Sequence, residues 1–170
     1  MLAHFDRRPL GYHVIRLDLL SVLEHRDVAL RAVAVACKQV TPKPEGPLFT
    51  DFRIQVVSAV GEAFNNIVLH GYAGRRDGMI KLRIRPRTDE IKIEIRDWGR
   101  SFDPKEVPIP DLEDLPESGL GLYIIHSFME VSYSPGRPNI LILSKKLQLA
   151  ADDEPAERRD LQIGMTDPKR

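Results

Sequence analysis

The sequence predicts one α/β domain, a two-layer α+β sandwich in which helices cover one face of a mostly antiparallel, mixed sheet. Two neighbouring stretches alternate strictly between apolar and charged residues, a pattern typical of strands with one buried face. Three other stretches carry apolar residues at helical spacing. The chain has 170 residues, of which 42% are hydrophobic, and this is enough for one domain with a real core.

The predicted elements alternate along the chain. The strand-like stretches are residues 12–20, 79–86, 90–97, 131–134 and 139–147. The helical stretches are residues 23–40, 48–72 and 119–129. Thr50 and Asp51 are candidate cap residues for the second helix, and Ser118 for the third. We place the domain at residues 1–149 and treat residues 150–170 as a charged C-terminal tail.

The hairpin and the long helix define most of the predicted core. One face of the hairpin carries aliphatic residues only: Ile80, Leu82, Ile84, Ile91, Ile93 and Ile95. The other face is charged, so we expect it to meet solvent. On the long helix, helical spacing predicts a buried face from Ile54, Val57, Phe64 and Val68.

Composition excludes several classes of protein. Lys and Arg total 25, as do Asp and Glu, so the chain lacks the basic field that gathers nucleic acid. The single cysteine, Cys37, cannot form an internal disulfide, and residues 1–14 lack the apolar core of a signal peptide. The most apolar run, residues 28–37, is shorter than the roughly 20 residues of a membrane span. We therefore expect a cytoplasmic protein with no direct nucleic-acid partner and no membrane partner.

A polar stripe runs along the long helix. Glu62, Asn66 and His70 are spaced by four and therefore share one face, which Ser58 extends backwards. A carboxylate and an amide carbonyl one turn apart suit a hard cation such as Mg²⁺. The alternative is a solvated helix face, in which His70 interacts with the helix dipole.

A second polar group lies at the end of the hairpin. Asp97 continues the inward face of Ile91, Ile93 and Ile95, so its carboxylate points towards the core. Such a carboxylate requires a donor, and the exocyclic amine of a purine is one donor that a ligand brings. The alternative is an Asx-type turn that closes the strand. Gly99 would let the backbone pass close to a ligand.

A long loop and a glycine-rich helix start follow. Residues 98–118 lose all periodicity and are rich in proline and acidic residues, and loops of this length are usually functional or disordered. The sequence SGLGL, residues 118–122, then offers backbone amides at a helix start for an anion. The alternative is a flexible entry to an apolar helix. In this order, the features provide a metal ligand, an adenine anchor and a phosphate cradle, as phosphoryl transfer requires.

These motifs resemble the GHKL-type ATPases with the Bergerat fold, and within them the RsbW-like (SpoIIAB-like) anti-sigma factor serine/threonine kinases. EAFNN is similar to the N box, DWGRSFDP to the first glycine box, residues 100–117 to the ATP lid and SGLGLYII to the second glycine box. The resemblance spans residues 12–147 and implies ATP and Mg²⁺ as cofactors. It implies Glu62 as general base and Asn66 as the Mg²⁺ ligand. The nucleotide-binding positions that it implies are Asn66, His70, Asp97, Gly99, Phe102, Ser118, Gly119, Leu120, Gly121 and Leu122.

The resemblance also implies a function. It implies a homodimer, joined through the first strand, that sequesters a sigma factor and phosphorylates a serine of a STAS-domain anti-sigma factor antagonist. Ser101, Glu117 and the Pro138–Asn139 pair depart from the family pattern, which has glycine, arginine and Gly-Thr there. These departures favour, as the alternative, a nucleotide-gated partner-binding module with little or no kinase activity. An interaction domain without nucleotide is a third class.

Overall fold

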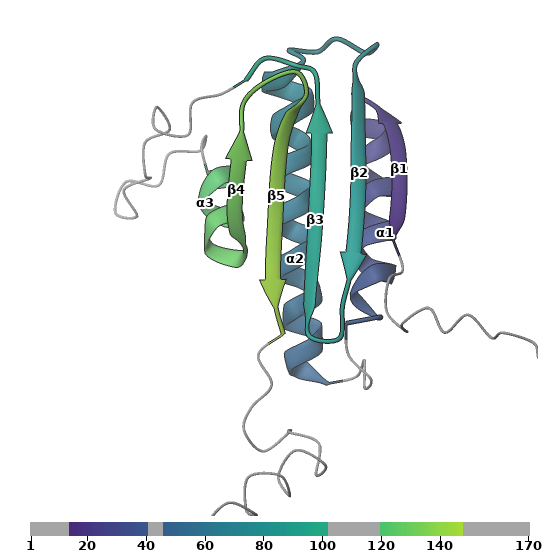
Figure 1. The fold of residues 1–170 in the computed structure, drawn as a ribbon, viewed down its shortest axis with the longest axis vertical. Coiled ribbons are helices and arrows are strands. Elements are labelled where there is room, and N and C mark those ends of the chain that lie inside the picture. The colour runs from purple at the N-terminus through teal and green to yellow at the C-terminus, as the bar shows by residue number, and fades with distance from the viewer. Residues whose placement is uncertain (1–13, 41–45, 102–119, 148–170) are drawn as a thin grey trace, which may run out of the picture.

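The protein folds as two layers, a sheet and a set of helices (Figure 1). The computed structural model describes residues 14–40, 46–101 and 120–147. Among them, five strands form one sheet in the order β1-β2-β3-β5-β4. The strands are β1 (Ile15–Leu20), β2 (Met79–Pro86), β3 (Glu90–Asp97), β4 (Glu130–Ser134) and β5 (Asn139–Lys146). The helices are α1 (Arg26–Cys37), α2 (Pro47–Asn66) and α3 (Leu120–Phe128), with a short turn η1 (Leu23–His25) before α1 and a π-helical turn η2 (Ile67–Gly71) after α2.

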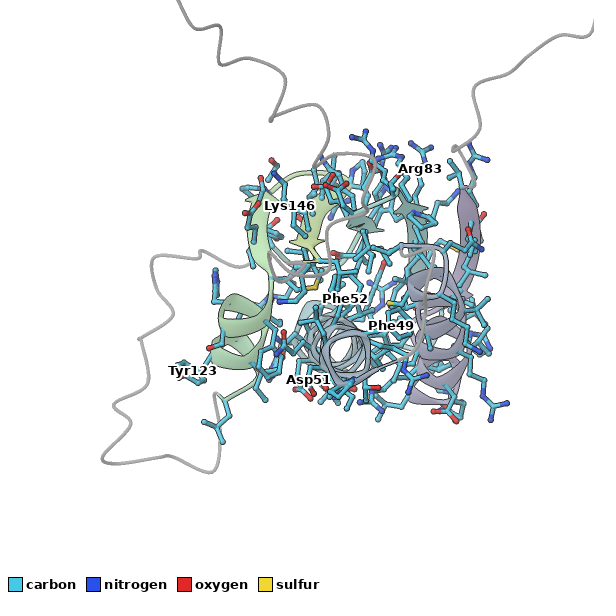
Figure 2. All side chains as sticks on the ribbon, turned by 90° about the horizontal axis from the view of Figure 1, so that it is seen from below. Phe49, Asp51, Phe52, Arg83, Tyr123 and Lys146 are labelled. Carbon is cyan, nitrogen blue, oxygen red and sulfur yellow. The ribbon has the colours of Figure 1, made fainter. Side chains whose placement is uncertain are left out.

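All three helices lie on the same face of the sheet (Figures 1 and 2). Figure 2 shows Phe52 between α2 and the sheet and Phe49 on the side of α2 that faces α1, while Asp51 points away from the sheet and Arg83 lies on the opposite face. The predicted two-layer α/β sandwich is confirmed. Every strand pair in the described part of the chain is antiparallel, so the sheet there is not mixed.

The hairpin has the register that its alternation predicts. Ile84 pairs with Ile93, and Leu82 with Ile95, so their side chains share the buried face. The six aliphatic residues of that face are each 0–2% exposed. The last pair joins Ile80 to Asp97, and the aspartate is therefore held on the buried face at the end of the strand.

The long helix begins within one residue of its predicted start, but its predicted cap residues were wrong. α2 begins at Pro47 after Gly46, and Thr50 lies inside the helix, where its Oγ donates to the Gly46 carbonyl at 3.0 Å. Proline fits the first turn because its missing N–H would have no partner there. The predicted cap at Asp51 is also wrong, because Asp51 lies inside the helix. Ser118, the predicted cap of the third helix, lies outside the described residues.

The buried face of α2 is also shifted from the prediction. Ile54 is 53% exposed, so its predicted burial was wrong, whereas Phe64 and Val68 are buried as predicted. Val57 is partly buried and packs at the edge of the core. The buried residues of α2 are Phe49, Phe52, Val56, Ala59, Val60, Gly61, Ala63 and Phe64.

The outer face of the sheet is charged, as predicted. Its central residue, Glu94, is 8% exposed because arginines surround it. Arg96 Nε lies 2.7 Å from Glu94 Oε1, and Arg83 and Arg85 lie within 3.8 Å of the same carboxylate. Within the described ranges, no helix is long and apolar enough to cross a membrane.

Candidate functional site

Asp97 is held at the end of β3 with one carboxylate oxygen already bonded. Its Oδ1 accepts hydrogen bonds from the Gly99 amide at 2.9 Å and from Asn139 Nδ2 at 3.0 Å. Burial raises the pKa of Asp97 above its ordinary value of 3.8, while the hydrogen bonds from Asn139 and Gly99 act in the opposite direction. The bond to Gly99 is the Asx-type turn that the sequence offered as an alternative. Among the described residues Oδ2 receives no hydrogen bond, so it can act as an acceptor for a ligand.

A close glycine contact joins Asp97 to the end of the long helix. A Cβ on Gly99 would lie 2.6 Å from the Gly71 carbonyl oxygen, which also accepts a hydrogen bond from the Arg100 amide at 2.8 Å. A Cβ on Gly71 would lie 3.9 Å from Asp97 Oδ1. Glycine at position 99 therefore lets the strand end touch the helix end, whereas a Cβ on Gly71 would meet its neighbours at ordinary contact distance.

Tyr72 fixes the same junction from the other side. Its hydroxyl donates to the Met79 carbonyl at 2.6 Å and accepts from the Trp98 amide at 2.9 Å. Tyr72 is 4% exposed and lies directly after η2. The end of the helix is thus attached to the start of β2 and to the residue that follows β3, which positions the polar stripe of α2 relative to Asp97.

The polar stripe faces the start of α3. A Cβ on Gly121 would lie 2.9 Å from Glu62 Oε2 and 3.7 Å from Asn66 Oδ1. Glu62 and Asn66 are both partly buried, and neither side chain makes a hydrogen bond to the described residues. A carboxylate and an amide that are half-buried and unbonded are available to a ligand. The atoms that these two side chains offer to a metal are oxygens. This fits Mg²⁺, which takes few protein ligands and fills its other coordination positions with phosphate oxygens.

The structure brings together most of the predicted site residues that it describes. Glu62, Asn66 and Gly121 form one group, and Asp97 and Gly99 form a second group that Gly71 connects to the end of the helix. His70 is exposed in η2, and no hydrogen bond within the described ranges joins it to either group. Leu120 and Leu122 lie in the first turn of α3 and are partly buried. Three predicted positions lie outside the described residues: Phe102, Ser118 and Gly119.

The sequence prediction missed Asn139. Its side chain is 1% exposed and bonds to Asp97, the residue that it faces across the β3–β5 pair. In the sequence analysis, Pro138 and Asn139 were noted only as a departure from the Gly-Thr pair of the family pattern. A polar residue at the start of the apolar strand sequence NILIL could have indicated a role for Asn139. Its partner, however, depends on which strand lies beside β3, and the sequence alone does not give this. Gly71 was missed for a similar reason, because its contact with Gly99 is not local.

A groove of about 530 Å³ lies at the other end of α2. From Phe52 to Asn66 the helix rises roughly 20 Å, so this groove is separate from the Asn66 site. Its lining residues are Leu48, Asp51, Phe52, Gln55, His126, Ser127, Phe128, Met129, Glu130, Ser144, Lys145, Lys146 and Leu147. The groove contains none of the residues that the motifs single out.

Comparisons with known proteins identify the family of this chain. Residues 23–145 match the family described as the histidine kinase-like ATPase domain. The anti-sigma F factor of Clostridium beijerinckii is 29% identical over 142 residues, which cover 79% of this chain and 95% of that protein. The anti-sigma F factor of Clostridium acetobutylicum is 31% identical over 148 residues, 81% of this chain and 96% of that protein. The serine-protein kinase RsbW of Oceanobacillus iheyensis is 30% identical over 116 residues, 64% of this chain and 72% of that protein.

The family match spans well over half of the sequence, and the chain belongs to the histidine kinase-like ATPase domain family. The resemblance to GHKL-type ATPases is thereby confirmed, and the relatives' names agree with its RsbW-like branch. Among solved structures, the histidine kinase domain from the Erythrobacter litoralis EL346 blue-light activated histidine kinase aligns with a TM-score of 0.47 at 17% identity. That alignment covers 72% of this chain and 61% of the other, and it is too distant to inform function.

Proposed function

We propose that this protein is an ATP-dependent protein serine/threonine kinase that also sequesters a sigma factor. The observation that carries the proposal is the close approach of Gly121 to Glu62 and Asn66, whose side chains make no hydrogen bond to the described residues. A glycine at a helix start lets backbone amides approach phosphates, and the two oxygen-bearing side chains beside it fit a magnesium ion and an incoming hydroxyl. Asp97 lies beside Gly71 at the end of the helix, and its Oδ2 provides an acceptor for the adenine amine.

Each residue then has a distinct task in the proposed reaction. Asp97 binds the adenine base, and Asn66 holds Mg²⁺ together with the nucleotide phosphates. Amides at the start of α3, around Gly119 and Gly121, bind the phosphates. When bound, Mg²⁺ neutralises charge on the phosphates. Glu62 orients or deprotonates the incoming serine hydroxyl, a role that general-base catalysis makes worth about 10²- to 10⁴-fold in rate.

The partners in this proposal come from the relatives' names and the family resemblance. A sigma factor is the partner that the name anti-sigma F factor indicates. We propose a STAS-domain anti-sigma factor antagonist as the serine-bearing substrate. We further propose a homodimer through β1, which is an edge strand of the described sheet. Its last residue, Leu20, is exposed, and so is Leu23 in the turn that follows.

A second candidate function is a nucleotide-gated binding module with little kinase activity. Ser101 Oγ donates to Asn139 Oδ1 at 2.6 Å, and this bond ties the start of the proposed lid, residues 100–117, to the base site. Nucleotide binding at Asp97 would then be sensed at the start of residues 102–119. In this candidate, ATP controls partner binding, and phosphate is not transferred at a useful rate.

A phosphotransfer assay separates the two candidates. The purified protein is incubated with Mg-ATP labelled on the γ-phosphate in a lysate of the native host, and Glu62→Ala and Glu62→Gln are compared with the wild type. The kinase predicts one small labelled protein, phosphorylated on serine or threonine, whose labelling falls about 10²-fold or more in both variants. Asp51→Ala is the control, because it lies on the same helix but points away from the sheet (Figure 2). Equal labelling in wild type and Glu62 variants would refute the role of Glu62.

Absence of labelling in all proteins, together with demonstrable ATP binding, would favour the nucleotide-gated module. Absence of ATP binding would refute both candidates. A pull-down of the sigma factor with and without Mg-ATP then measures whether partner binding depends on nucleotide.

A further inference from the structure

The side chain of Asn139 is a fully bonded polar group in an otherwise apolar layer. Its Nδ2 donates to Asp97 Oδ1 at 3.0 Å and to the Gly99 carbonyl at 3.3 Å. Its Oδ1 accepts from Ser101 Oγ at 2.6 Å and from the Gly136 amide at 3.0 Å. An amide side chain has two N–H donors and one carbonyl oxygen with two lone pairs, and all of these are used.

These partners allow only one orientation of the amide. The Gly136 N–H can only donate, so the side-chain carbonyl must face it. The Gly99 carbonyl can only accept, so the side-chain NH₂ must face that side. Turning the amide of Asn139 by 180° would break both bonds. The donor that reaches Asp97 is therefore fixed by two backbone groups that belong to different loops.

This orientation determines what Asp97 offers to a ligand. Its Oδ1 receives two donors, from Asn139 and from Gly99, and its Oδ2 receives none from the described residues. A single acceptor at a fixed position suits a purine that presents an N–H donor there, as the exocyclic amine of adenine does. A guanine presents a carbonyl oxygen at the same ring position, and two acceptors repel each other.

We propose that Asn139 is a positioning residue that makes the site selective for adenine over guanine, by fixing Asp97 so that only Oδ2 faces the base. The inference rests on the proposed nucleotide function and adds a specificity determinant to it. Without the Asn139 amide, the Asp97 carboxylate loses one of its two donors. The carboxylate can then rotate or bind water, and it discriminates less between adenine and guanine.

The test is a titration of each variant with Mg-ATP and with Mg-GTP. Trp98, the single tryptophan, follows Asp97 directly and provides an intrinsic fluorescence signal. Asn139→Ala is expected to reduce the ratio of ATP to GTP affinity by about tenfold or more, because a hydrogen bond to a charged group is lost. Ser144→Ala is the matched control on the same strand and should leave both affinities unchanged.

The affinity ratio distinguishes positioning from a general loss of structure. Unfolded protein binds neither nucleotide, so partial unfolding lowers the amplitude of both titrations and leaves the ratio of dissociation constants unchanged. Should Asn139→Ala not fold, Asn139→Ser keeps a short donor and is expected to lose part of the selectivity. In an Asp97→Ala background, which leaves no side-chain acceptor for Asn139 to orient, Asn139→Ala should no longer change the ratio, because its effect acts through Asp97.

The possible outcomes separate this inference from the proposed function. A wild-type protein that binds neither nucleotide overturns both. A wild-type protein that prefers ATP, with the same preference in Asn139→Ala and Asn139→Ser, overturns the role of Asn139 alone. An effect of Asn139→Ala on the ratio that persists in the Asp97→Ala background also overturns it, because Asn139 would then act by another route.

Discussion

Replacing Asp97 by asparagine should weaken adenine binding and stabilise the fold at the same time. The substitution keeps the shape of the side chain. The introduced amide oxygen can still accept the hydrogen bonds from Gly99 and Asn139 that Oδ1 accepts now, at 2.9 and 3.0 Å. What changes is the other terminal atom, where an acceptor becomes an NH₂ donor. That atom is the one that we propose meets the adenine amine.

The binding effect follows from the chemistry of that single contact. A hydrogen bond to a charged group contributes about 1.5–3 kcal/mol, so Asp97→Asn should weaken Mg-ATP binding roughly 10- to 150-fold. The new donor should meet the carbonyl of guanine more favourably than the carboxylate did. Mg-GTP binding should therefore change less, or improve. Titrations with both nucleotides measure this.

The stability effect follows from the raised pKa of Asp97 in the folded protein. The folded protein holds the proton of Asp97 to a higher pH than the unfolded chain does. Protonated Asp97 therefore stabilises the fold fully below its ordinary pKa of 3.8, and this stabilisation is lost as the pH rises through the higher pKa of the folded state. At neutral pH the folded wild type carries a desolvated charge. Asp97→Asn should therefore melt at a higher temperature than wild type at pH 7, and the difference should shrink towards pH 4 or below. Unchanged ATP affinity, or a lower melting temperature at pH 7, would refute this reasoning.

Three further predictions concern residues around the site. Gly121→Ala should fold, because the atom closest to its Cβ would be Glu62 Oε2, the end of a flexible side chain, at 2.9 Å, while Asn66 Oδ1 at 3.7 Å stays at ordinary contact distance. Displacing the Glu62 carboxylate should lower phosphotransfer about 10²-fold while ATP binding persists; equal rates would contradict the placement. Tyr72→Phe should reduce the free energy of unfolding by about 1–3 kcal/mol in urea titrations, because the Trp98 amide loses its acceptor; an unchanged midpoint would contradict this. Burial raises the pKa of Cys37 to about 12, so a thiol reagent at pH 8 should label it only after unfolding; rapid labelling of the folded protein would contradict its burial.

Much of the fold could be predicted because it depends on local periodicity. Strict alternation over residues 79–86 and 90–97 determines which side chains face inward, and Asp97 follows by parity from Ile95. The cap of α2 could not be predicted in this way, because Pro47 fits the first turn without a polar cap residue before it. The exposure of Ile54 depends on how α2 rotates against its neighbours, which spacing alone does not set.

The site was predictable where a motif is continuous in the sequence. Glu62 and Asn66 share a stripe because of helical geometry, and this needs no tertiary information. Asn139 needed the pairing of β3 with β5, two strands that are far apart in the chain. Gly71 needed the contact between the helix end and the strand end. Such contacts are set by how the layers pack.

The measurement that tests the central claim most directly is an amide chemical-shift titration of the wild-type protein with Mg²⁺ and a non-hydrolysable ATP analogue. The account predicts that the largest shifts occur at Asn66, Gly71, Gly99 and Gly121, which border the proposed base and phosphate positions. Residues of the groove at the start of α2, such as Phe52 and Gln55, should shift little. Shifts centred on that groove, with Gly99 and Gly121 unchanged, would contradict the assignment of the nucleotide site.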